Sequence, residues 1–152
     1  MKVRIAWVGK SREAWVREAL DDYGARIRRY AQLELAEVRE EKGAQADEMR
    51  RRECERLEKL IPPAAAVLLL DELGEQMNSP GLAAFIGKQR DMGIGELVFV
   101  IGGAYGFSED FRRRGRLLSL SKMTFTHQMV RVFLLEQIYR AFTILNNEPY
   151  HH

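Results

Sequence analysis

The sequence predicts an α/β protein with one parallel sheet and helices on both faces. Strand-like and helix-like segments alternate along all 152 residues, a pattern typical of parallel sheets with crossover helices. Two strand-like segments, 65–70 and 96–101, are unbroken apolar runs, as expected for strands buried on both faces. No repeat, linker or low-complexity tract divides the chain, so we expect a single domain over residues 1–152.

Capping and breaking residues define the elements of the first half. A strand ends at Gly9, and Ser11 is the expected N-cap of the following helix. Pro62 and Pro63 end a highly charged second helix. The segment 37–56, which runs into this helix, mixes acidic and basic side chains and is the expected mobile surface region. The predicted elements are strand 2–8, helix 11–29, strand 33–38 and helix 46–61.

Further signals define the second half. Ser79 before Pro80 is typical of a helix start, although two glycines within that helix disfavour it. The last helix presents apolar side chains on opposite sides, for example Leu134 and Leu135, and leaves a narrow polar strip. We expect the sheet to cover one side and a second copy of the chain to cover the other; the alternative is cover by N-terminal helices of the same monomer. The predicted elements are strand 65–70, helix 79–91, strand 96–101, helix 108–114, strand 117–120 and helix 126–146.

Composition narrows the function classes. The net charge is only +2, whereas a free-standing nucleic-acid binder usually has a stronger basic excess. The densest basic cluster contains four arginines within residues 112–116. The single cysteine, Cys54, excludes an intrachain disulfide, and no cysteine–histidine cluster predicts a metal site. No apolar run approaches the roughly 20 residues of a membrane span, and residues 1–8 are too short for a signal peptide, so we expect a cytoplasmic protein.

Two turns that follow strands carry the candidate site, because ligands of open α/β sheets bind at the carboxyl ends of strands. The first, 102–106, is rich in glycine. It lacks the spacing of dinucleotide and triphosphate loops, but its glycines permit close backbone approach to a ligand; a mere connector is the alternative. The second, 119–126, is rich in hydroxyls that would cap the last helix or line a pocket. His127 follows it, either as a hydrogen-bonded structural residue or as a catalyst.

The C-terminal motifs resemble those of the RlmH family, the small SPOUT-superfamily methyltransferases that modify a pseudouridine of large-subunit ribosomal RNA. The resemblance covers the whole chain. Two positions depart from the family, because Ala104 and Thr126 stand where many members have proline. The motifs that carry the resemblance are Val100-Ile101-Gly102-Gly103, Gly106, Leu118-Ser119-Leu120-Ser121-Lys122-Met123-Thr124-Phe125, His127-Gln128-Met129-Val130-Arg131, Glu136-Gln137-Ile138-Tyr139-Arg140-Ala141 and Pro149-Tyr150-His151.

The resemblance implies an S-adenosylmethionine-dependent methyltransferase that forms a homodimer. It also implies a deep C-terminal trefoil knot, with knot and cofactor pocket within about residues 65–152. The reaction implied is N3-methylation of a pseudouridine in 23S rRNA, for which the weak charge favours the assembled ribosome as substrate. A non-catalytic ribosome- or RNA-binding protein with this fold, and a flavodoxin-like nucleotide-binding domain, are the alternatives. The implied cofactor-binding residues are Leu70, Gly103, Ser121, Lys122, Met123, Thr124, Phe125 and Thr126.

The chemistry of the implied reaction suggests roles for the other residues of the quoted motifs. Methyl transfer is mainly a positioning problem, and N3 of the base must lose its proton. A group that titrates near neutral pH suits that step, so His127 and His151 are candidate bases, and Arg131 is a candidate for stabilising the developing anion. Tyr150 is expected to stack on a splayed base. A frayed end is the alternative for this tail.

Overall fold

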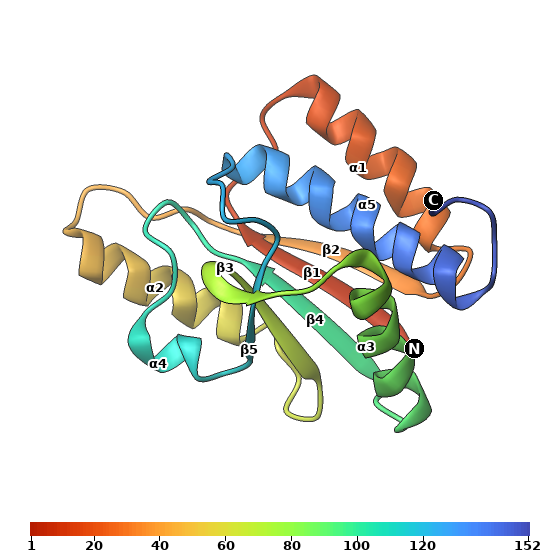
Figure 1. The fold of residues 1–152 in the computed structure, drawn as a ribbon. Helices are drawn as coiled ribbons and strands as arrows, with labels where there is room; N and C mark the ends of the chain where they lie inside the picture. Colours follow the sequence, from red (N-terminus) through yellow and green to blue (C-terminus); the bar gives the residue numbers. More distant parts are fainter.

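The computed structural model describes residues 1–152 and contains one sheet of five parallel strands in the order β2-β1-β4-β3-β5 (Figure 1). The first strand therefore lies inside the sheet, between the second and the fourth. This confirms the predicted parallel α/β class. The strands are β1 (Lys2–Val8), β2 (Gln32–Val38), β3 (Ala66–Gln76), β4 (Glu96–Ile101) and β5 (Arg116–Ser119).

Helices cover both faces of this sheet, as predicted (Figure 1). Side chains of a strand alternate between faces, and the buried residues of β4 follow that rule. Leu97 and Phe99 join the core beneath three helices, whereas Val98 and Val100 join the core beneath the other two. The first layer contains α1 (Ala14–Ile27), α3 (Ser79–Asp91) and α5 (His127–Leu145), and the second contains α2 (Ala46–Glu58) and α4 (Glu109–Arg112).

Two predicted helix caps are wrong because other groups take the hydroxyls. Helix α1 begins at Ala14, and Ser11 does not cap it; the Ser11 hydroxyl accepts a hydrogen bond from Arg131 at 3.0 Å. Helix α3 is capped by Asn78, whose side chain accepts from the Gly81 amide at 2.7 Å. The Ser79 hydroxyl instead donates to Gln137 of α5. A long-range partner therefore takes the hydroxyl of each predicted cap, while α3 still begins at Ser79, as predicted, under a local Asn78 cap.

Strand β3 is longer than predicted and irregular where it passes β5. The register of the pair shifts between Leu70 and Glu75, so the residues between them leave the regular ladder. Gly74 lies in this excursion. A Cβ at that position would come within 2.6 Å of the carbonyl carbon of Leu117, so the close passage of the two strands requires glycine.

Helix α5 is covered within the monomer. Its two sides face α1 and α3, and Leu134, Leu135 and Ile138 are fully buried. Tyr139 lies with its ring centroid 6.2 Å from that of Tyr23 in α1. Phe133 is the large apolar side chain of this helix left exposed. Helices of the same chain therefore cover α5, the N-terminal α1 as in the alternative reading and α3 from the middle of the chain, so the apolar pattern itself does not demand a second copy.

Candidate active site

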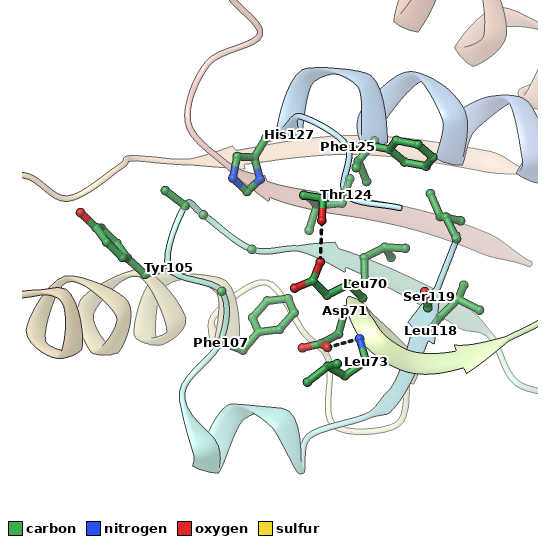
Figure 2. A pocket seen from close by; sticks show the side chains of 18 of the residues that line it. Leu70, Asp71, Leu73, Tyr105, Phe107, Leu118, Ser119, Thr124, Phe125 and His127 are labelled. Carbon is green, nitrogen blue, oxygen red and sulfur yellow. Dashed lines mark hydrogen bonds between the residues drawn. The ribbon is translucent and has the colours of Figure 1, made fainter. Parts of the chain in front are cut away.

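A cavity of about 700 Å³ opens at the carboxyl edge of β3, β4 and β5. Three chain segments form its walls: the β3 excursion from Leu70, the turn after β4, and the segment after β5 (Figure 2). The first turn of α5 closes it on the fourth side. The cavity therefore lies where the topology of an open α/β sheet places a ligand site.

Apolar side chains at the ends of the strands form the floor of the cavity. Leu70 comes from β3, Ile101 from β4 and Leu118 from β5, and Phe107 and Phe125 extend this surface. A cavity of this volume with an apolar floor and a few polar groups is typical of a site for a small organic ligand.

Acidic side chains connect two of the three walls. The carboxylate of Asp71 accepts a hydrogen bond from the Leu73 amide at 2.8 Å and pairs with Arg112. The carboxylate of Glu72 accepts from the Thr124 hydroxyl at 3.0 Å (Figure 2). These bonds tie the excursion of β3 to the end of α4 and to the segment that follows β5.

Hydroxyl groups shape the segment between β5 and α5. Ser119 donates to the Ser121 carbonyl at 2.8 Å, and the Ser121 hydroxyl accepts from the Met123 amide at 3.0 Å. Thr126 is the N-cap of α5 and accepts from the Met129 amide at 3.3 Å. The hydroxyl-rich pattern thus serves local folding, and Thr126 supplies the cap without the proline common in the family.

His127 lies at the rim of the cavity, in the first turn of α5 (Figure 2). Partial burial lowers the pKa of its imidazole below the ordinary value of 6.5, and the charge of Arg131 lowers it further. The neighbouring Gln128 accepts from the Arg12 amide at 3.2 Å and donates to the Lys10 carbonyl at 3.1 Å. His127 is therefore held on a fixed helix end, in surroundings that disfavour the charged form of its imidazole.

Arg131 does not line the cavity. Its side chain is 1% exposed, and its guanidinium donates to the Val8 carbonyl at 2.8 Å and to the Ser11 hydroxyl at 3.0 Å. It also lies over the Trp7 ring, with 5.0 Å to the centroid. Burial lowers the pKa of this guanidinium to about 10. Within one chain Arg131 binds the β1–α1 turn to α5.

The tail lies far from the cavity in the same chain. The Tyr150 hydroxyl donates to Glu136 at 3.1 Å, and Arg140 donates to His151 at 3.2 Å. Glu136 is nine positions beyond His127 on α5, a rise of about 14 Å at 1.5 Å per residue. Figure 1 shows the C-terminus beside the end of α1, away from the first turn of α5. The structure does not bring Tyr150 and His151 to His127 of their own chain.

The structure thus brings together most of the predicted cofactor residues. Lys122 and Thr126 do not line the cavity. Asp71 and Glu72 were missed, although their place directly after a buried strand was a usable signal. Arg50 and Arg112 also line the cavity; Arg50 comes from α2, far from the two turns in sequence. The predicted residues that line it are Leu70, Gly103, Ser121, Met123, Thr124 and Phe125, together with His127.

The arginines that follow the cavity turn are paired with carboxylates. Arg112 pairs with Asp71, and Arg114 lies 2.8 Å from Glu58. Arg116 forms a bidentate pair with Glu75, with distances from 2.7 to 3.0 Å. The densest basic cluster of the sequence is therefore neutralised by its neighbours and offers few free cations to RNA phosphates.

Comparison with known proteins defines the class to which this fold and site belong. Residues 1–151 match a family model described as "Predicted SPOUT methyltransferase", and the chain belongs to this family. It is 79% identical, over the full length of both chains, to the ribosomal RNA large subunit methyltransferase H of Pelobacter propionicus. It is 62% identical to the protein of the same name from Geobacter sulfurreducens, again over the full length of both.

A solved structure with a similar arrangement is the SpoU methyltransferase AviRb from Streptomyces viridochromogenes in complex with the cofactor AdoMet. The TM-score is 0.45 at 14% identity, and the match covers 92% of this chain and 57% of that chain. No helix of the present structure is long and apolar enough to cross a membrane. No group of three histidine, cysteine or acidic side chains is arranged to hold a metal ion.

Proposed function

We propose that this chain transfers a methyl group from S-adenosylmethionine to a pseudouridine of large-subunit ribosomal RNA. The curated relatives that share most of its sequence are named for methylation of that RNA. The observation that carries the proposal is the imidazole of His127 at the rim of an apolar cavity at the carboxyl edge of the sheet, where burial and the charge of Arg131 lower its pKa. A proton acceptor and a cofactor-sized site therefore adjoin one another.

The cavity fits this cofactor in size and chemistry. Its volume of about 700 Å³ falls within the roughly 300–1,000 Å³ typical of ligand sites. Leu70, Ile101 and Leu118 offer an apolar surface that suits an adenine ring. Glu72 and Arg50 line the same cavity, and side chains of opposite charge suit the ammonium and carboxylate of the amino-acid portion.

His127 performs the proton transfer in the proposed reaction. The bound cofactor supplies an electrophilic methyl group on a sulfonium. N3 of a pseudouridine carries a proton that must leave as the N–CH₃ bond forms, and the neutral imidazole accepts it. Arg131 does not touch the substrate in this proposal. It fixes the first turn of α5 against the β1–α1 turn, and its charge adds to burial in lowering the pKa of the imidazole.

We further propose that the protein acts as a homodimer in which the tail of one chain completes the site of the other. The tail of a single chain lies against the far half of α5, held by Arg140 and Glu136. Exposed apolar side chains surround the cavity mouth, with Leu73 80% and Met123 75% exposed. Exposed apolar surface of this kind marks interaction sites, and two-fold contact there would bring a second chain to the cavity.

The assembled ribosome is the proposed substrate, within the cytoplasm. A net charge of +2 and arginines already paired with carboxylates give little affinity for naked RNA through counterion release. Recognition then depends on the shape of a folded target. The trefoil knot and its extent, about residues 65–152 of one domain, belong to the same proposal because the family implies them.

Methyl transfer from tritiated S-adenosylmethionine to ribosomes that lack the modification tests the reaction. The wild-type chain is expected to label the 23S rRNA, and His127→Ala to lose labelling while it binds the cofactor. Glu55→Ala, a change in an exposed side chain of α2, is the control and should retain activity. Binding to ribosomes without any labelling by the wild type would instead support the non-catalytic RNA-binding alternative.

Mixing two inactive variants tests the shared site. His127→Ala retains the tail, whereas a chain that lacks residues 150–152 retains His127. When subunits exchange at equal amounts, half of the dimers are mixed and each has one complete site, so activity should return to about a quarter of wild type. No recovery from a mixture that has formed mixed dimers would refute a tail that acts on the other chain.

A further inference from the structure

Glu53 of α2 is a buried carboxyl that the proposed reaction does not use. The residue is 3% exposed. One carboxyl oxygen accepts a hydrogen bond from the Glu41 amide at 3.0 Å, and the other, Oε1, has no hydrogen-bond partner. Burial raises the pKa of this group. A buried carboxyl with an unpaired oxygen costs stability, so its position calls for a role.

The unpaired oxygen lies directly behind Gly103. A Cβ built on Gly103 would come within 2.6 Å of Glu53 Oε1 and 3.3 Å of a Val8 methyl group. Gly103 lines the cavity, whereas neither Glu53 nor Val8 does. The missing side chain of Gly103 therefore points into the protein, and the glycine is required by what lies behind the turn rather than by a ligand in front of it.

The same helix holds the turn at two further points. Arg50 donates to the Tyr105 carbonyl at 2.8 Å, at the tip of the turn. The Cys54 sulfur accepts from the Ser108 amide at 3.5 Å, where the turn leads into α4. Arg50, Glu53 and Cys54 lie on one face of α2, because positions three and four apart are neighbours on a helix. The start, tip and end of the turn all contact this face.

We propose that α2 supports the glycine turn and that Glu53 is a positioning residue that sets the affinity of the cavity for its cofactor. This role rests on the proposed function only for the identity of that cofactor. It also gives the charged segment 37–56, which the sequence predicts as a mobile surface, a structural task. The carboxyl of Glu53 fills the space behind Gly103 and keeps the turn at a fixed distance from the cavity, with Arg50 anchoring its tip.

Calorimetry with S-adenosylmethionine tests the proposal, because the effect of Glu53→Ala on binding affinity should have opposite signs in two backgrounds. Glu53→Ala should weaken binding about tenfold in the wild-type background. Glu53→Gln, which keeps the shape of the side chain, should stay within about threefold of wild type. Gly103→Ala should also weaken binding, because its methyl group displaces the carboxyl. In that background the added Glu53→Ala change should strengthen binding, because it frees the space that the new methyl group needs.

Glu55→Ala is the matched control on α2, since that side chain is 62% exposed, and its affinity should equal wild type. Amide hydrogen exchange at residues 103–106 without cofactor gives a second readout: exchange should be faster in Glu53→Ala and unchanged in Glu55→Ala. It tests the support role even if the wild type binds no S-adenosylmethionine, a result that would refute the proposed function alone. Unchanged exchange in Glu53→Ala, or equal weakening by that change in both backgrounds, would overturn the inference.

Discussion

The burial of the Arg131 guanidinium distinguishes between a catalytic and a stabilising role, which the sequence motif alone does not. A residue that stabilises charge in the reaction must reach the cavity, whereas a residue that fixes α5 acts through stability. Arg131 is 1% exposed and donates to the Val8 carbonyl and the Ser11 hydroxyl. We therefore expect Arg131→Met to lower the stability of the fold and to leave cofactor affinity nearly unchanged.

The size of the effect follows from the contacts that are lost. Each hydrogen bond from a charged donor contributes about 1.5–3 kcal/mol, and an orphaned buried carbonyl costs about 1–3 kcal/mol. Burial lowers the pKa of the Arg131 guanidinium to about 10, so the buried charge itself costs free energy. Its removal therefore offsets a substantial part of this loss. A net loss of about 2–4 kcal/mol remains, and for a domain of this size it lowers Tm by roughly 5–15 °C.

Thermal unfolding and calorimetry with S-adenosylmethionine on the same samples measure the two quantities. Arg113→Met is the matched control, because that side chain is 77% exposed, and its Tm should equal wild type. A Tm of wild-type value in Arg131→Met would refute the stabilising role. A large loss of cofactor affinity at unchanged Tm would place the guanidinium at the reacting groups.

Three further predictions concern catalysis and assembly. The rate of methylation should fall at acid pH, with an apparent pKa below 6.5, because burial and the charge of Arg131 lower the pKa of His127. Protonation of this imidazole removes the base. Arg131→Met should shift the acid limb of the pH profile to higher pH. Light scattering at micromolar concentration should give about twice the chain mass, and a monomer would refute the shared site. Methylation should be efficient on assembled ribosomes and poor on protein-free 23S rRNA; equal rates on both would show that naked RNA is recognised directly.

The alternation of apolar strands and amphipathic helices was sufficient to predict the parallel sheet, because burial on both faces leaves a distinct pattern. The capping residues were not predictable from local propensity, although the start of α3 at Ser79 was. Ser11 and Ser79 both have the chemistry of a cap, but Arg131 and Gln137 engage their hydroxyls from more than fifty positions away. Such competition is decided by tertiary packing, which a local window does not contain.

The candidate site was predictable where it depends on topology. Strand ends that meet at one edge placed Leu70, Gly103 and Ser121 around one cavity. The reason for the glycine at 103 was not predictable, because Glu53 reaches it from a helix fifty positions earlier. The place of the tail was not predictable either, since it depends on contacts with Arg140 and Glu136 on the far half of α5.

The position of β1 inside the sheet has a consequence for synthesis on the ribosome. Lys2 pairs with Glu96 in the register of β1 and β4, so one edge of β1 has no partner until ninety-odd further residues have been made. At about 5–20 residues per second, this interval lasts roughly 5–20 s. The nascent chain then exposes an apolar strand edge to the crowded cell, where it is prone to mispairing. The segment 96–101 ends that vulnerable period, because it supplies the missing partner of β1.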